Sequence, residues 1–220
     1  MNQLVTPRAP FSALSRELCD SIQAGILAYT YRGVRAYKCP FDLAIYTQLL
    51  SDLKPRTIVE FGSNMGGSAL WLADTIESLG LHGTKIFTLD IIYMHEYEDP
   101  RIRFIQCDVG DIGRYMPRHI VDSWEKPILF IDDASHQYKH SLNILHFFDE
   151  VSSVGDYIIV EDGIISIMDA EEQYEGGPHR AIHEFIAKRG EEFLIDRKRC
   201  DYFGYNVTWN IDGYIQRVGR

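Results

Sequence analysis

The sequence predicts an α/β protein with a doubly wound, mostly parallel sheet of seven strands. Short apolar runs alternate with amphipathic runs of helical length between residues 57 and 188, which is the pattern of repeated βα units. A glycine-rich turn follows the first apolar run at once, and acids follow every predicted parallel strand. Because helices cover both faces of such a sheet, charges gather where the strands end. Ligands of open α/β sheets bind at those carboxyl ends.

The strands and helices follow from these patterns. The predicted parallel strands are residues 57–61, 85–90, 103–107, 128–131 and 157–160. The predicted helices of this region are residues 67–79, 138–151 and 178–188. Short strand-like runs at residues 193–196, 207–210 and 214–218 predict an antiparallel hairpin at the C-terminus.

Two helices precede the sheet, at residues 11–31 and 41–53. Residues 1–53 are therefore predicted to form an N-terminal helical segment, which covers the substrate site or contacts another subunit. Residues 54–220 form the ligand-binding domain. The tyrosines of the first segment, together with the loop at residues 174–179, either stack on a ring of the substrate or pack the helices.

Composition limits the partners. The formal net charge of −10 argues against a nucleic-acid binder, which needs a basic surface. No apolar run is long enough to span a bilayer, and the N-terminus lacks the pattern of a signal peptide. Four widely separated cysteines without a CxxC pair make a zinc site unlikely and indicate a reduced, cytoplasmic setting.

The glycine-rich turn at residues 62–67 leaves free helix amides facing a ligand. A phosphate-binding P-loop would need a lysine before Ser68, and a dinucleotide-binding turn would need glycine in place of Asn64. S-adenosylmethionine fits better, because acids repel phosphates but attract its cationic groups. Glu60 suits its amino acid part, Asp90 its ribose hydroxyls and Asp108 its adenine amine. A tight turn without a ligand is the alternative.

A second acidic group follows the fourth and fifth strands: Asp132 and Asp133 follow one, and Glu161 and Asp162 the other. If these strands are neighbours, the carboxylates converge and could bind Mg²⁺. His136 is placed to remove a proton from a hydroxyl, although a helix-start histidine bonded to the backbone is an equal alternative. We expect five other histidines to be structural or solvent-facing: His119, His140, His146, His179 and His183. His179 also borders a loop that could cover the site.

Several motifs together resemble a known family. They are KCPFD at residues 38–42, VEFG at 59–62, GGS at 66–68, IDDASH at 131–136, GDY at 155–157, VEDG at 160–163 and GGP at 176–178. The sequence resembles the cephalosporin hydroxylase / rhamnosyl O-methyltransferase family, which is related to metal-dependent macrolide sugar O-methyltransferases. The resemblance covers residues 38–218 and implies a Rossmann-like class I methyltransferase fold, an oligomer and bound Mg²⁺.

The resemblance also implies roles for individual residues. The metal ligands would be Asp133, Glu161 and Asp162, and His136 would match the general base, acting with Asp133. Glu60, Gly62 and Asp90 would match cofactor-binding positions. The full set of candidate cofactor-binding residues is Glu60, Gly62, Ser63, Asn64, Gly67, Ser68, Asp90, Asp108 and Asp132.

The expected function is therefore Mg²⁺-assisted O-methylation of a small hydroxylated acceptor, such as a sugar or natural-product intermediate. Two alternatives are a hydroxylase-pathway oxidoreductase and a non-catalytic S-adenosylmethionine-binding partner protein. The oxidoreductase would need a redox cofactor, and the two-His-one-carboxylate arrangement of many iron sites is not visible in the sequence. A homo-oligomer acting on a small molecule, without nucleic acid or membrane, is the expected assembly.

Overall fold

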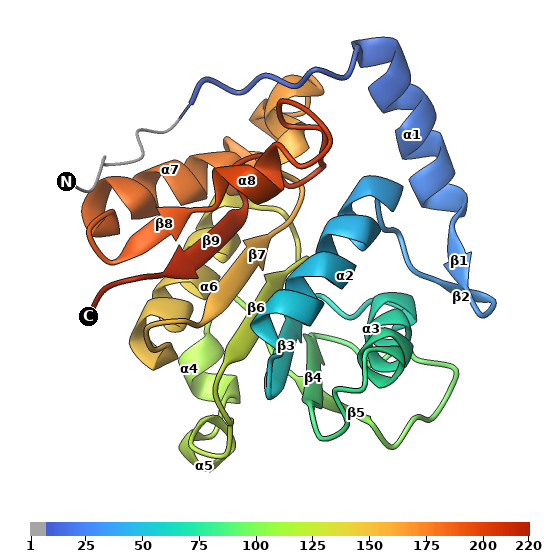
Figure 1. The fold of residues 1–220 in the computed structure, drawn as a ribbon, viewed down its shortest axis with the longest axis vertical. Coiled ribbons are helices and arrows are strands. Elements are labelled where there is room, and N and C mark those ends of the chain that lie inside the picture. Colours follow the sequence, from blue (N-terminus) through green and yellow to red (C-terminus); the bar gives the residue numbers. More distant parts are fainter. Residues whose placement is uncertain (1–7) are drawn as a thin grey trace.

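The computed structural model describes residues 8–220, and its centre is a seven-stranded sheet with the order β5-β4-β3-β6-β7-β9-β8 (Figure 1). The first five strands in this order are parallel, and β9 runs antiparallel to both β7 and β8. The strands are β3 (Thr57–Phe61), β4 (Lys85–Asp90), β5 (Ile102–Gln106), β6 (Ile128–Asp132), β7 (Tyr157–Val160), β8 (Phe193–Ile195) and β9 (Tyr214–Arg217). The predicted fold class and the C-terminal hairpin are confirmed.

Helices cover both faces of this sheet (Figure 1). On one face α2 meets α3 through the rings of Tyr46 and Trp71, and on the other α6 meets α7 through His146 and Phe185. The long helices are α2 (Pro40–Leu53), α3 (Gly67–Ser78), α6 (Tyr138–Val151) and α7 (Gly177–Arg189). Shorter helical turns are α4 (Ile112–Tyr115), α5 (Arg118–Val121), η1 (Gly163–Ile167), η2 (Glu172–Tyr174) and α8 (Arg197–Cys200). Double coverage explains why every residue of β3 and β6 is buried.

Strand register places the predicted acids at one edge of the sheet. Phe61 lies opposite Leu89 in β4 and opposite Asp132 in β6, and Asp132 lies opposite Val160 in β7. The carboxyl ends of β4, β3, β6 and β7 therefore lie side by side. This pairing confirms that the strands before Asp133 and Glu161 are neighbours.

The N-terminal segment differs from its prediction. Helix α1 spans only Arg16–Ala28, and its first turn is capped by the hydroxyl of Ser15, which accepts a hydrogen bond from the amide of Leu18. The chain then forms a small hairpin of β1 (Thr30–Tyr31) and β2 (Val34–Arg35), and β1 replaces the last residues of the expected helix. Since β-branched and aromatic residues favour strands, Thr30 and Tyr31 end the helix early.

The hairpin packs directly on the start of α3. A side chain at Gly67 would place its Cβ 2.2 Å from the carbonyl oxygen of Arg35, so the two backbones touch because this residue is glycine. Helix α1 joins a separate small core with η1 and the segment before β9, in which Cys19, Trp209 and Ile211 are buried.

The expected strand at residues 207–210 is wrong. These residues form bends, although all of them are buried. Their polar groups bond to Asp42 of α2 instead of to a neighbouring strand: the backbone amide of Trp209 and the hydroxyl of Thr208 both donate to its carboxylate. Tyr214 donates to the same carboxylate at 2.8 Å. Alternating apolar and polar residues here reflect a buried loop around a carboxylate and resemble a strand only in sequence.

Within residues 8–220 no helix is both long enough and apolar enough to cross a membrane. All four cysteines are buried and free of disulfide bonds.

Candidate active site

The glycine-rich turn between β3 and α3 lies between the ends of β4 and β6. The amides of Gly62 and Ser63 donate to the carbonyl of Leu89, at 2.7 and 3.1 Å. Gly62 has a φ of 95°, and a Cβ there would lie 1.9 Å from the carbonyl oxygen of Asp133. Only glycine permits both this torsion and this contact, so the turn brings the backbone of residues 62–64 against the strand ends.

One cavity, of about 330 Å³, opens between the ends of β4 and β5; we call it the β4–β5 cavity. Gly62, Asn64, Asp90 and Asp108 line it, as does Asp133. One oxygen of Asp90 accepts a hydrogen bond from the amide of Asn64 at 2.9 Å, which fixes the carboxylate beside the turn. One oxygen of Asp108 accepts from the amide of Gly110 at 2.8 Å. Four of the predicted cofactor-binding residues therefore share one cavity.

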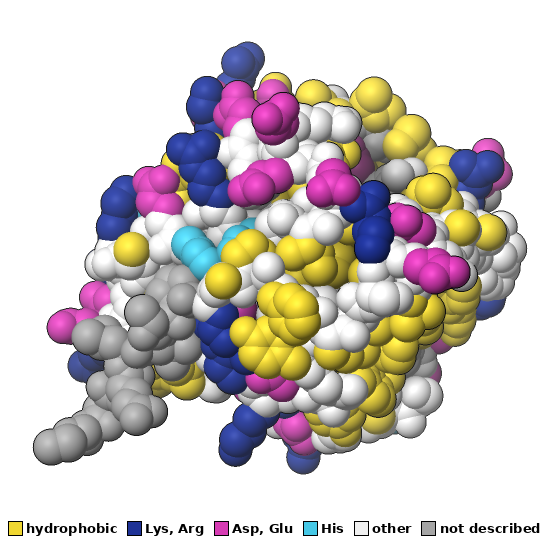
Figure 2. All heavy atoms as spheres, turned by 90° about the horizontal axis from the view of Figure 1, so that it is seen from above, with side chains coloured by type: hydrophobic (Ala, Val, Ile, Leu, Met, Phe, Trp, Pro, Cys, Tyr) yellow, Lys and Arg dark blue, Asp and Glu magenta, His cyan; other side chains and the backbone are white. Residues whose placement is uncertain are grey.

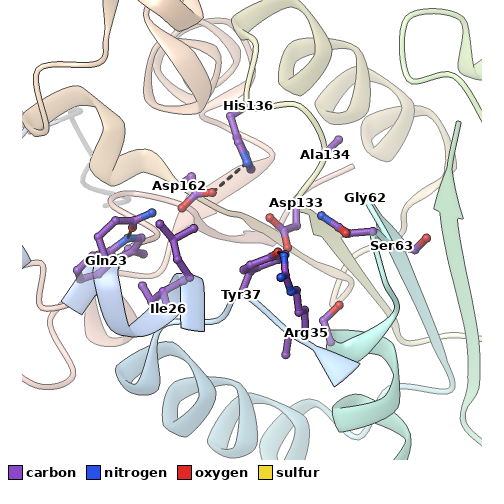
Figure 3. Close-up of a pocket in the computed structure, with 15 residues that line it drawn as sticks. Gln23, Ile26, Arg35, Tyr37, Gly62, Ser63, Asp133, Ala134, His136 and Asp162 are labelled. Atoms are coloured by element: carbon purple, nitrogen blue, oxygen red, sulfur yellow. Dashed lines mark hydrogen bonds and ion pairs between the residues drawn. The ribbon is translucent and has the colours of Figure 1, made fainter. Parts of the chain in front are cut away.

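A second cavity, of about 230 Å³, lies between the strand ends and the N-terminal segment; we call it the α1 cavity (Figure 3). Gln23, Arg35 and Tyr37 form its wall on the side of α1 and the hairpin, and Asp133, His136 and Asp162 come from the strand ends. Ser63, Asn64 and Ser68 of the glycine turn also line it. Asp133 borders both cavities.

The structure does not place Glu60, Gly67 or Asp132 on either cavity. The Glu60 carboxylate is fully buried, where it accepts hydrogen bonds from the hydroxyls of Ser68 and Thr88. Burial raises the pKa of Glu60. These hydrogen bonds link the start of α3 to β4, so Glu60 would affect a ligand in the cavities only through Ser68.

Three side chains at the strand ends form a compact group: Asp133, His136 and Asp162. Their ligand atoms all lie within 4.8 Å of one another, and Nε2 of His136 is 3.2 Å from Oδ2 of Asp162 (Figure 3). His136 and Asp162 both have positive φ values, 58° and 59°. Left-handed torsions in residues other than glycine cost about 1 kcal/mol or more and are often found at functional sites.

Electrostatics in this group favour a cation. Burial lowers the pKa of His136, but the charges of Asp162, Asp133 and Asp132 raise it further, and the net pKa is above the ordinary value. Burial also raises the pKa of Asp162, and it raises that of Asp132 to about 6. Carboxylates clustered in this way, here half-buried, repel one another when ionised, and a bound cation would offset that repulsion. Oxygen-rich donors of this kind fit Mg²⁺.

Glu161 has a different neighbour. Its carboxylate accepts hydrogen bonds from the ammonium of Lys38 and, at 2.6 Å, from the hydroxyl of Tyr46. The same ammonium lies 2.5 Å from Oδ2 of Asp133, so Lys38 bridges two of the three expected metal ligands. Burial would lower the pKa of Lys38, but Asp133, Glu161 and Glu60 raise it above its ordinary value.

Sequence reasoning did not single out Lys38 or Arg35. Lys38 was named only as part of the KCPFD motif. The one sequence feature that could have indicated its role is its position just before an apolar helix. Arg35 donates to the hydroxyl of Tyr37 at 2.9 Å, and both face the α1 cavity. Tyr31 donates to Asp74 on α3 and so has a packing role.

The sheet order, the glycine turn and the strand-end cavities define a Rossmann-like fold of the methyltransferase type. The chain belongs to the Rhamnosyl O-methyltransferase/CmcI family, whose model matches residues 25–218. The resemblance stated from the sequence motifs is thus confirmed.

Individual relatives agree with this assignment. Rhamnosyl O-methyltransferase of Mycobacterium tuberculosis (strain ATCC 25618 / H37Rv) is 29% identical over 196 residues, which are 86% of this chain and 78% of the relative. The protein of the same name from Mycobacterium leprae (strain TN) is 27% identical over 194 residues, covering 86% of this chain and 82% of the relative.

Solved structures share the fold. A CmcI apo structure superposes with a TM-score of 0.69 at 26% identity, covering 88% of this chain and 78% of that one. A CmcI structure with Mg and SAM gives a TM-score of 0.68 at 24% identity, covering 96% and 82%. MycE in complex with Mg, SAH and Mycinamycin VI gives 0.51 at 20% identity, covering 66% and 43%.

Proposed function

We propose that this protein is an S-adenosylmethionine-dependent, Mg²⁺-assisted O-methyltransferase that acts on a hydroxyl group of a small molecule. The observation that carries this proposal is the position of Asp133, which borders both cavities and lies beside His136. A methyl donor in one cavity and an acceptor in the other would meet at this residue. The family assignment supports the same reaction class, since its curated relatives are named as O-methyltransferases.

The methyl donor fits the β4–β5 cavity. Asp90 offers carboxylate oxygens to ribose hydroxyls, and Asp108 lies farther along the same cavity, where an adenine amine could donate to it. Asn64 and Gly62 would hold the amino acid part against the turn. The carboxylates of this cavity would repel the phosphates of a nucleotide cofactor, which favours a donor without phosphates.

The acceptor fits the α1 cavity, where its hydroxyl would lie near the ring of His136. The imidazole takes the hydroxyl proton, the oxygen attacks the methyl carbon, and the carbon–sulfur bond breaks. The products are a methyl ether, protonated His136 and S-adenosylhomocysteine. Fixing donor and acceptor on the two sides of Asp133 supplies the alignment that such an in-line transfer needs.

We propose Asp133 and Asp162 as metal ligands, with Glu161 joining them if Lys38 withdraws. When bound, Mg²⁺ acts as a Lewis acid that makes an acceptor hydroxyl more acidic and offsets the carboxylate charge around His136. The CmcI and MycE structures described above contain Mg, which supports this assignment.

The acceptor class we propose is a sugar or a natural-product intermediate. Arg35 and Tyr37 offer polar groups to hydroxyls, and the largely buried Trp209 also lines this cavity. The names of the mycobacterial relatives refer to a rhamnosyl acceptor, and the MycE structure holds Mycinamycin VI.

We also propose a cytoplasmic homo-oligomer that binds neither nucleic acid nor membrane. Exposed aromatic side chains such as Phe11, Tyr202 and Phe203 support subunit contacts, and hydrophobic groups gather on the face seen in Figure 2. Acidic and basic side chains are mixed on the described part of that face, which offers no continuous basic surface to a polyanion (Figure 2).

The test combines ligand binding with turnover. Calorimetric titration of the protein with S-adenosylmethionine should show one site, and Asp90→Ala should weaken it. A panel of hydroxylated sugars and macrolides, incubated with labelled donor, should then yield a methyl ether whose formation stops with a chelator and returns with Mg²⁺.

Three outcomes would contradict the proposal. Tight NAD binding without S-adenosylmethionine binding would favour an oxidoreductase. Donor binding without methyl transfer to any acceptor would favour a non-catalytic binding protein. Full turnover in the presence of chelator would remove the metal from the mechanism.

A further inference from the structure

A second group of potential metal ligands lies outside the site described above. His179 and His183 are four residues apart on α7, so their side chains share one face of the helix. Asp212 approaches them from the turn before β9. One ligand atom from each residue lies within 4.8 Å of the others. The sequence analysis did not detect this two-His-one-carboxylate group, because Asp212 is 29 residues from His183 in the chain, and it expected both histidines to be structural or solvent-facing.

The distances suit a tetrahedral ion. Oδ2 of Asp212 is 3.1 Å from Nε2 of His183 and 3.7 Å from Nε2 of His179. Zinc bonds to nitrogen and oxygen of about 2.0–2.1 Å place neighbouring tetrahedral ligands roughly 3.3 Å apart. The two imidazole rings are 3.9 Å apart between centroids, so the rings would have to rotate apart for both Nε2 atoms to bind one ion.

The Nε2 atom of His179 has no hydrogen-bond partner among the described residues, although the residue is only 7% exposed. A buried polar atom left without a partner costs about 1–3 kcal/mol. A metal ion between His179, His183 and Asp212 would give this nitrogen a partner. The unpartnered nitrogen is thus a second observation that indicates a ligand.

Arg197 fixes the third ligand. Its guanidinium donates to Oδ1 of Asp212, which leaves Oδ2 directed at the two imidazoles. A carboxylate ligand held by an outer hydrogen bond is the common arrangement in metal sites. The charge of Arg197 opposes the cation and should limit its affinity. Burial lowers the pKa of His179 to about 4 and also lowers that of His183, which favours the neutral form of the rings that metal binding requires.

We propose that His179, His183 and Asp212 bind a divalent transition metal ion of the zinc type, separate from the Mg²⁺ proposed at Asp133. Two imidazoles and one carboxylate favour such an ion over Mg²⁺, which prefers oxygen ligands. The ion would join α7 to the turn before β9. That turn is already tied to the sheet, because the amide of Val160 donates to the carbonyl of Gly213 at 2.8 Å. The role inferred is structural: the ion holds α7 beside the strand ends.

Cobalt(II) is the probe, because its visible absorption reports tetrahedral nitrogen and oxygen ligands. The full chain, stripped with chelator, is titrated as the Asp133→Asn variant so that the strand-end group contributes little. One equivalent should bind with an intense visible band. Adding His183→Ala or Asp212→Asn should weaken binding more than about 100-fold, since loss of even an outer-shell partner costs 10–100-fold. His119→Ala, an exposed histidine on α5, is the matched control and should bind as before.

Equal binding with and without His183 would overturn the proposal, as would loss of all binding in Asp133→Asn. Circular dichroism of the metal-free variants checks that they fold. If His183→Ala does not fold, X-ray absorption of cobalt bound to the Asp133→Asn variant decides: two imidazole ligands support the site, and an oxygen-only shell refutes it.

Discussion

Replacing Lys38 with methionine tests whether one ammonium compensates the strand-end carboxylates. Lys38 is 4% exposed and contacts both Asp133 and Glu161, whose side chain is 7% exposed. Removing one partner of a buried ion pair leaves an uncompensated charge and costs about 3–5 kcal/mol. We therefore expect Lys38→Met to lower the free energy of unfolding by about that amount at pH 8 without metal.

Adding Mg²⁺ and lowering the pH should each reduce this loss of unfolding free energy. Mg²⁺ at ten times its dissociation constant adds about 1.4 kcal/mol of stability, and we expect tighter binding in the variant because the competing ammonium is gone. The pKa of Glu161 is raised well above its ordinary value by burial. A carboxyl whose pKa is higher in the folded than in the unfolded protein stabilises the fold while it is protonated, and this contribution is lost as the pH rises through the folded-state pKa. The stability that Lys38→Met loses should therefore become smaller as the pH falls towards 5.

The assay is urea denaturation followed by circular dichroism, at pH 8 and pH 5, with chelator or with Mg²⁺. Lys188→Met removes an exposed lysine that pairs with Glu184 on the same helix, and it should change little. If Lys38→Met loses less than about 1 kcal/mol at pH 8 without metal, the buried-pair reasoning is refuted.

Three further variants test the site. His136→Ala should lower kcat about 10²–10⁴-fold while donor affinity, measured by calorimetry, is kept, because only proton removal is lost; unchanged kcat would exclude it as the base. Asp90→Ala should weaken donor binding about 10–100-fold through lost charge-assisted hydrogen bonds, whereas equal affinity would place the ribose elsewhere. Gly62→Ala should lower the melting temperature markedly, since its Cβ would meet the carbonyl of Asp133 at 1.9 Å, and a normal melting curve would contradict that contact.

The sheet could be predicted because its strands are buried on both faces. Runs such as residues 57–61 and 128–132 are mostly apolar and buried throughout, and Gly62 follows where the chain must turn sharply. Local pattern therefore specified strand, turn and helix without reference to distant residues. The hairpin at residues 30–35 was missed because each strand has only two residues, too few for a periodic signal.

The site was less accessible to sequence reasoning, because its geometry depends on residues far apart in the chain. Lys38 contacts Asp133 and Glu161, which are 95 and 123 residues away in the sequence, and no local pattern encodes such contacts. Acids at strand ends could be foreseen to converge, but not which of them would face a cavity. Glu60 illustrates the difference: side chains alternate along a strand, and its carboxylate faces the buried hydroxyls of Ser68 and Thr88.

The two cavities share Gly62, Asn64, Asp133 and Ala134, but their remaining walls come from different parts of the chain, and this difference affects how the protein can evolve. Gln23, Arg35 and Tyr37, which border the α1 cavity, all precede the first strand of the main sheet, whereas Asp90 and Asp108 belong to strand ends. If the α1 cavity holds the acceptor, as proposed, mutations in the first forty residues should alter acceptor choice while leaving the donor site intact. Exchanging that segment between relatives would then redirect the methyl group to new acceptors.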